Sequence, residues 1–149
     1  MPGGFVIRRR SILALVVVLA AAAIGVERWI VTDREAIHAL VEDAAEAVAR
    51  DDWVALAEAF DEEAAYGARD KAALVNWIRT EQRTHHATHV QAVVGETKLN
   101  GDTASARVRA TGTGPYGPFV VTADVDFVRR ESGWKIAGVR DPELGTPFR

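Results

Sequence analysis

The spacing of hydrophobic residues changes twice along the chain, and each change predicts a different kind of structure. Residues 11–26 are uncharged and almost entirely apolar. Between residues 32 and 80 the apolar positions recur every three or four residues, which is typical of amphipathic helices. From about His89 they alternate with polar positions, as in strands that are buried on one face. We therefore expect an apolar segment, a group of helices and a sheet, in that order.

The apolar segment has the features of a membrane anchor. Arg8, Arg9 and Arg10 precede it, and Glu27 and Arg28 come directly after it. As a helix it is roughly 24 Å long, and the residues after Arg28 extend it towards the ~30 Å of a hydrocarbon core. Because the arginines of such segments stay on the cytoplasmic side, the domain after the segment lies outside the cytoplasm. We predict a single-pass anchor in the cell membrane, residues 1–31, which contacts the bilayer through residues 11–31.

Two alternatives exist for the same segment. Ala21 to Ala23 provide the small residues of a signal-peptidase site, so a cleaved signal peptide also fits the pattern. Arg9 and Arg10 loosely match a twin-arginine export signal. Each alternative still places the next domain, residues 32–149, in an extracytoplasmic position.

Helix-capping residues divide the first half of this domain. Thr32 and Glu35 have the spacing of a capping box, which begins a first helix. Asp51 or Asp52 is suited to cap a second, shorter helix, and Asp70 a third. The pattern therefore predicts two or three helices before the strands begin.

Turn signals divide the second half into four strands. Asn100-Gly101 favours a tight hairpin, and the segment GTGPYGP and the residues around Gly133 mark two further turns. Each strand has one apolar face, which needs a covering layer of helices. We predict an α+β domain in which the helices pack on a curved antiparallel sheet.

Composition and charge exclude several classes of protein. The net charge is −3, which gives no support to nucleic-acid binding. The chain has no cysteine, so it has neither disulfides nor thiolate metal sites. A hydrophobic content of 48% supports a core of ordinary size.

The order of elements resembles the nuclear-transport-factor-2-like superfamily, which includes the SnoaL-like proteins. The resemblance rests on ARDDWVALAEAFDEEAAY in the opening helices, DKAALVNWIR in the third helix and GWKIAGV in the last strand. It covers residues 32 to about 144. It implies a conical fold with a pocket between the helices and a concave sheet, and frequent dimers through the sheet. No cofactor is expected.

Strand pairing predicts which polar side chains face that pocket. If Asn100-Gly101 is the hairpin loop, Gln91 lies opposite Ala110, and His89 and Gln91 share the core face near the open end of the cone. Tyr66 is a third candidate, from the connection after the second helix. Arg140 joins them only if the last strand has no bulge. The segment AGV, residues 137–139, is a favourable site for a bulge.

The same argument directs charged residues to the opposite face. If the strand over 119–127 buries its alternate Phe, Ala and Val residues, Asp124 and Asp126 point outwards, opposite or diagonal to Arg107 and Arg109. This face is either a solvated surface or the one through which a homodimer forms, and a ligand-binding set of charges is the alternative.

The histidine-rich stretch HHATH, residues 85–89, is the only other cluster that could bind a ligand. His85 and His89 are four residues apart, but no carboxylate has the spacing of an H-E-x-x-H motif, and a helix ends here. We therefore predict no metal site.

These patterns support two functional hypotheses, and a purely structural dimer through the sheet face with the Arg and Asp residues is a third option. The first is a membrane-anchored, extracytoplasmic binding or assembly module with partners in the cell envelope, which acts without a catalytic site. The alternative is a SnoaL-like pocket enzyme, an isomerase, cyclase or dehydratase, that acts on a small apolar molecule through His89 with Tyr66 or Gln91. The isomerase type needs a carboxylic acid in an apolar pocket, and the inward positions of two strands contain none.

Overall fold

The computed structural model describes residues 33–145 of the chain. The chain divides into two compact units, Met1–Glu35 and Ala36–Arg149. The predicted anchor and Thr32 of the predicted capping box lie outside the described residues. Within residues 33–145, no helix is both long enough and apolar enough to cross a bilayer.

Two helices of the second unit, α2 and α3, begin where the sequence predicts. A first helix covers residues 33–49 of the described chain, and α2 (Trp53–Ala59) and α3 (Lys71–His85) come after it. The side chain of Asp52 accepts a hydrogen bond from the Ala55 N–H at 3.1 Å and caps α2. Asp70 caps α3 in the same way, through the Ala73 N–H at 2.9 Å. Both caps satisfy backbone donors that a helix leaves unpaired in its first turn.

Among the described residues, the sheet has five strands rather than the predicted four. The predicted meander is present as β2 (His89–Asn100), β3 (Thr103–Gly114), β4 (Gly117–Arg130) and β5 (Gly133–Gly145). The additional strand, β1 (Phe60–Ala65), pairs in parallel with β5, so the order is β1-β5-β4-β3-β2. Its sequence, FDEEAA, lacks the alternation of a half-buried strand, and this is why the pattern did not reveal it.

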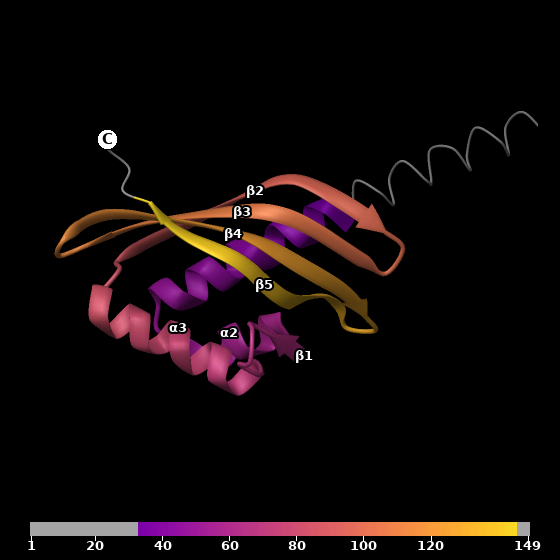
Figure 1. Ribbon diagram of the computed structural model, residues 1–149, viewed down its shortest axis with the longest axis horizontal. Helices are drawn as coiled ribbons and strands as arrows, with labels where there is room; N and C mark the ends of the chain where they lie inside the picture. Colours follow the sequence, from indigo (N-terminus) through magenta and orange to yellow (C-terminus); the bar gives the residue numbers. More distant parts are fainter. Residues whose placement is uncertain (1–32, 146–149) are drawn as a thin grey trace, which may run out of the picture. The chain divides into compact units, whose positions relative to one another are not determined.

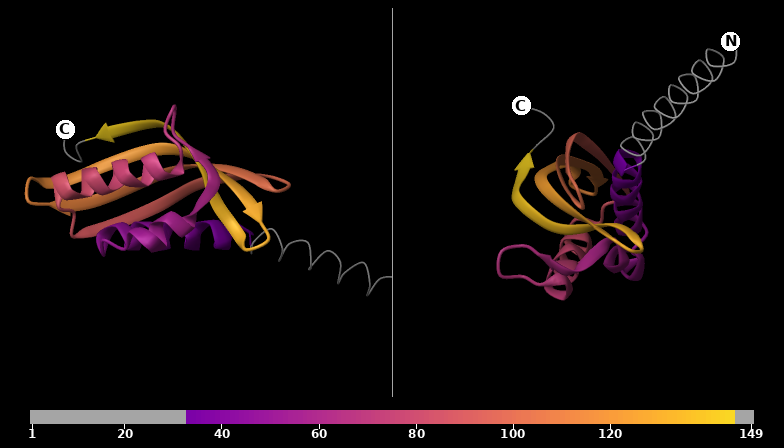
Figure 2. Two further views of the ribbon diagram at one scale, coloured as in Figure 1. Left: turned by 90° about the horizontal axis from the view of Figure 1, so that it is seen from below. Right: turned by 90° about the vertical axis from the view of Figure 1, so that its right-hand side faces the viewer.

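The three helices lie on one side of the curved sheet (Figures 1 and 2). We call the face that packs against them the inner face and the opposite one the outer face. Ile37 of the first helix, Leu74 of α3 and Phe127 of β4 are the largest fully buried side chains. The core therefore forms where these helices meet the inner face, which confirms the predicted α+β architecture.

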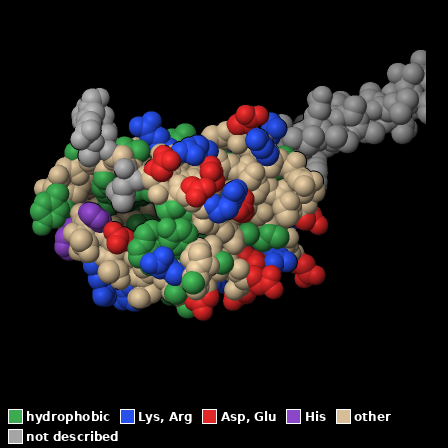
Figure 3. Space-filling view, in the orientation of Figure 1, with side chains coloured by type: hydrophobic (Ala, Val, Ile, Leu, Met, Phe, Trp, Pro, Cys, Tyr) green, Lys and Arg blue, Asp and Glu red, His purple; other side chains and the backbone are tan. Residues whose placement is uncertain are grey.

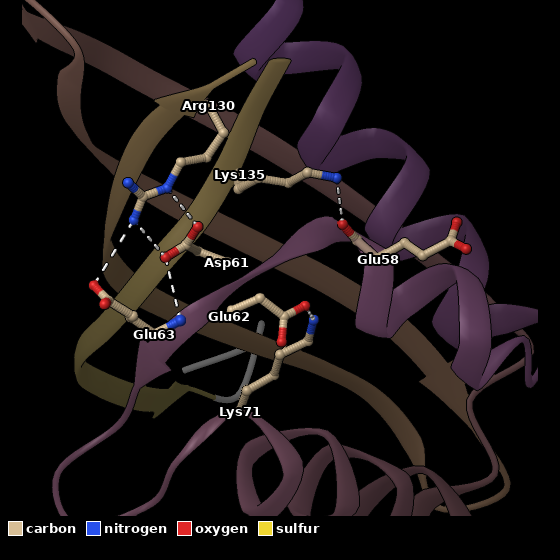
Figure 4. A network of polar contacts seen from close by, with 7 residues as sticks. All are labelled: Glu58, Asp61, Glu62, Glu63, Lys71, Arg130 and Lys135. Atoms are coloured by element: carbon tan, nitrogen blue, oxygen red, sulfur yellow. Dashed lines mark hydrogen bonds and ion pairs between the residues drawn. The ribbon is translucent and has the colours of Figure 1, made fainter. Parts of the chain in front are cut away.

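An ion pair ties the missed strand β1 to β4, across β5. Arg130 donates to both carboxylate oxygens of Asp61, from Nε at 2.8 Å and from Nη2 at 2.9 Å (Figure 4). The Asp61 side chain is only 8% exposed. The hydrogen bonds from Arg130 lower the pKa of Asp61 more than its burial raises it, and the Glu63 N–H also favours the charged form.

We expect Asp61→Asn to reduce the free energy of unfolding at pH 7 by about 1–3 kcal/mol, because Arg130 loses a charged acceptor. Since the folded-state pKa of Asp61 is lowered, the pair stabilises the fold above the unfolded-state pKa of about 4, and this contribution is lost as the pH falls through the folded-state value. Urea unfolding at neutral pH and at a series of acidic values measures both effects.

Glu62→Gln is the matched control, because Glu62 is the adjacent carboxylate, is 90% exposed and pairs with Lys71 rather than with Arg130. It should change the free energy of unfolding by less than about 1 kcal/mol. Two results would contradict the assigned role of Asp61. One is an equal change in the free energy of unfolding in both variants. The other is a difference in this free energy between the two variants that is the same at pH 2–3 as at pH 7.

Candidate functional site

The structure places His89 and Gln91 on the outer face, not in the pocket. The hairpin loop is Gly101-Asp102, one residue later than predicted, because Asn100 pairs with Thr103. The pairing of β2 with β3 then shifts by one residue between Val94 and Thr97. This bulge reverses the side-chain parity of the first half of β2. The predicted pocket orientation of these residues was therefore wrong.

A second bulge turns Arg140 outwards. The pairing of β5 with β4 shifts between Asp126 and Phe127, at Ala137 in the AGV segment that favours a bulge. Arg140 donates to both carboxylate oxygens of Asp126, at 2.8 and 2.9 Å. These hydrogen bonds raise the pKa of Arg140. Arg140 therefore does not join a pocket on the inner face.

Tyr66 lies in an aromatic cluster at the base of α3. Its ring stacks on that of Trp77, with centroids 5.4 Å apart, and both rings pack against the core. The guanidinium of Arg69 lies 5.3 Å from the Tyr66 centroid and 5.5 Å from that of Trp77. A backbone bridge between Tyr66 and Arg69 holds this loop in place. Tyr66 therefore lies beside the helices, whereas His89 and Gln91, its predicted partners, lie on the outer face of the sheet.

Two polar residues of α3 also lie near the inner face. Trp77, Glu81 and His85 recur every four residues and therefore form one stripe along this helix. Nε2 of His85 lies 3.3 Å from a carboxylate oxygen of Glu81, and each side chain is roughly half exposed. The i, i+4 spacing was visible in the sequence, but the histidine was interpreted there only as part of HHATH.

Phe119 shows that this stripe faces the sheet. It belongs to the set of alternate β4 residues that includes Ala123, Val125 and Phe127, all of them buried on the inner face. Its ring covers Gly112 of β3 and lies 6.1 Å, centroid to centroid, from that of His85. His85 and Phe119 therefore meet at the end of the inner face near the turn between β3 and β4. We call the stripe, Phe119 and Tyr66, which stacks on Trp77 of the stripe, the open-end site.

A hollow is visible on the molecular surface near this end (Figure 3). Histidine, acidic and apolar side chains surround it in that view. Apart from Gly112, the buried inner residues of β3 and β4 are Ala, Val and Phe, so the acid of the open-end site comes from a helix rather than from the sheet. The arrangement provides apolar surface, stacked aromatic rings and one carboxylate–imidazole pair.

The residues of HHATH point apart. His85 belongs to the stripe, and His86 ends α3 in a left-handed conformation with φ 46°. His89 is exposed, with Nδ1 3.1 Å from the hydroxyl of Thr88. Among residues 33–145, no three His, Cys, Asp or Glu side chains are grouped as a metal ion would require.

The outer face has the predicted Arg107, Asp124 and Asp126, but Asp126 pairs with Arg140 rather than with an arginine of β3. Arg107 pairs with Asp124 across the strands, at 3.5 Å, and with Glu143 of β5, at 3.2 Å. Arg140 and Asp126 form the second unit of the array. We call these five residues the charge array. The exposed side chains of Val93 and Arg109, which pair across β2 and β3, lie beside it.

Comparison with known proteins identifies the family. The profile of a SnoaL-like domain matches residues 29–140, well over half of the chain, and the chain therefore belongs to this family. No curated protein shows significant similarity to it. The fold is nuclear-transport-factor-2-like, as the resemblance implied.

Three solved structures share this fold. A nuclear-transport-factor-2-like protein from Novosphingobium aromaticivorans is 22% identical, with a TM-score of 0.66 over 83% of this chain and 90% of that one. A protein of unknown function from Mycobacterium tuberculosis is 19% identical, with a TM-score of 0.63 over 82% and 76%. A suggested aromatic ring hydroxylase from N. aromaticivorans is 24% identical, with a TM-score of 0.59 over 78% and 92%. At these identities the similarity concerns the fold alone.

The contact between Gly112 and Phe119 gives a test of the open-end site. A methyl group at Gly112 would overlap the Phe119 ring, so we expect Gly112→Ala to displace this ring and destabilise the fold by about 1–2 kcal/mol. Urea unfolding and the aromatic circular dichroism of the folded protein measure the two effects. Gly145→Ala is the control, because its nearest neighbours leave room for a methyl group, at 3.9 Å or more. Equal stability of both variants would contradict the placement of Phe119.

Proposed function

We propose that the protein is a membrane-anchored, extracytoplasmic binding and assembly module that associates through the outer face of its sheet. The observation that carries this proposal is the charge array. Its positive and negative side chains alternate across three strands, beside the exposed Val93. A surface with both signs of charge can be complementary to a second copy of itself about a two-fold axis.

The energetics of exposed ion pairs support this interpretation. Such pairs stabilise a folded monomer by only about 0–1 kcal/mol each. The side chain of Arg107 is 52% exposed and that of Arg140 is 56% exposed, so both remain accessible to a partner. Their carboxylate partners hold them in position, which reduces the entropy lost on association. Partners among envelope proteins are part of the same proposal.

A pocket enzyme that acts on a small apolar molecule is the second candidate. The pair of Glu81 and His85 favours it, because a histidine beside a carboxylate can serve as a general base or acid. Tyr66 and Trp77 provide an aromatic surface for such a substrate. In this alternative, the catalytic histidine is His85 rather than the predicted His89.

Charge reversal at Arg107 tests the assembly surface. We expect the full-length protein to form a dimer. Arg107→Glu should weaken this dimer at least about tenfold, because the new carboxylate has the same charge as Asp124 and Glu143 beside it. Native mass spectrometry over a concentration series measures the dissociation constant. Arg83→Glu, on the exposed surface of α3, is the control and should leave the dimer intact. The pocket enzyme is favoured instead if the protein is a monomer with a bound apolar molecule and the variant His85→Ala no longer binds that molecule.

The absence of cysteine allows a direct test of topology. Ser132 lies in the exposed turn between β4 and β5, and Gly4 belongs to the arginine-containing N-terminal segment. In intact cells, a membrane-impermeant maleimide should label Ser132→Cys but not Gly4→Cys, which should react only after lysis. Labelling with the opposite pattern would reverse the proposed topology. Loss of the Gly4 site from the mature protein would show cleavage rather than anchoring.

A further inference from the structure

A separate cleft lies on the other flank of α3. Its residues on this helix are about half a turn away from the stripe of Trp77, Glu81 and His85. The cleft has a volume of ≈ 530 Å³ and is bounded by α2, β1 and α3. This volume falls within the range of sites for small organic ligands.

Apolar side chains face each other across part of the cleft, and the other residues that line it are polar or charged. Trp53 and Ala57, one turn apart on α2, form one wall, and Ala72 and Val75 of α3 form the other. Trp53 is half-buried and packs against the core, so the position of its ring is fixed from behind. A flat or extended hydrocarbon group can therefore lie against apolar side chains of both helices.

Most charged groups at the cleft already have partners. Lys71 donates to the carboxylate of Glu62 at 2.8 Å (Figure 4), and the Asp70 carboxylate caps α3. Arg79 differs, because no carboxylate of the described residues lies within ion-pair distance of it. Its guanidinium lies over the Trp53 ring, 5.9 Å from the centroid. A stacked guanidinium keeps its in-plane N–H donors available, and these match a carboxylate in a bidentate geometry.

We infer that this cleft binds a small organic carboxylate with an aromatic or aliphatic body. The body lies between Trp53 and Val75, and the carboxylate accepts hydrogen bonds from Arg79. The side-chain amide of Asn76, which lies one turn before Arg79 and also lines the cleft, is a second donor. This site is independent of both the charge array and the open-end site, so it can be tested without the proposed function being correct.

The test is isothermal titration calorimetry of 4-phenylbutyrate with the full-length protein. We expect one molecule to bind per chain, and Arg79→Gln to weaken binding at least about tenfold, because a charge-assisted hydrogen bond is lost. Arg83→Gln, one turn further along α3 and outside the cleft, should have no effect beyond twofold. The uncharged analogue 4-phenylbutanol should bind at least about tenfold more weakly than 4-phenylbutyrate.

Two further variants locate the binding site. Ala72 is exposed at the cleft, so Ala72→Phe should fill it and abolish binding without a change in the core, whereas His85→Ala should leave binding unchanged. Circular dichroism confirms that each variant is folded, and Arg79→Lys is measured beside Arg79→Gln as a variant that keeps the charge.

Three results would overturn the inference. The first is no heat of binding up to millimolar 4-phenylbutyrate. The second is an equal loss of affinity in Arg79→Gln and Arg83→Gln, which would indicate only a general attraction to positive charge. The third is binding that survives Ala72→Phe but is lost in His85→Ala, which would assign the ligand to the open-end site.

Discussion

An inserted residue in a β-strand turns all the subsequent side chains to the opposite face of the sheet. Two such bulges determine how polar groups are distributed in this protein. The bulge in β2 directs His89 and Gln91 outwards, and the bulge at Ala137 in β5 does the same for Arg140. Without them, these three polar side chains would point towards the inner face. The bulges therefore keep the inner face apolar and concentrate charge on the outer face.

This separation gives the domain three surfaces with different chemistry. The outer face has paired charges and suits association with another macromolecule. The open end has aromatic rings and a carboxylate–imidazole pair on α3. The cleft between α2 and α3 has apolar side chains on both helices and a single cation without a carboxylate partner among the described residues. α3 contributes residues to the open end from one flank and to the cleft from the other. Its attachment to the core through the buried Leu74 therefore matters to both surfaces.

Features that depend on a few neighbouring residues were predictable from the sequence. The caps at Asp52 and Asp70 and the alternation of β4 result from local hydrogen bonding and spacing, and the structure confirms them. The strand β1 was not predictable, because FDEEAA is stabilised by its pairing with β5 and by Arg130, which is 69 residues away from Asp61. The bulge in β2 was missed for a similar reason. The register of β2 depends on contacts with distant residues, although Gly95, which lies at the shift, is a residue type that often marks a bulge inside a strand.

The bulge in β2 also affects the boundary of the sheet. β2 is an edge strand, and its outer backbone groups are free of strand partners along the described sheet. The bulge interrupts this edge, and exposed Glu96 and Lys98 lie beside the interruption. The opposite edge, β1, is only six residues long. Irregular, charged or short edges resist the addition of further strands, so crowded copies of this domain are protected from growing into fibrils.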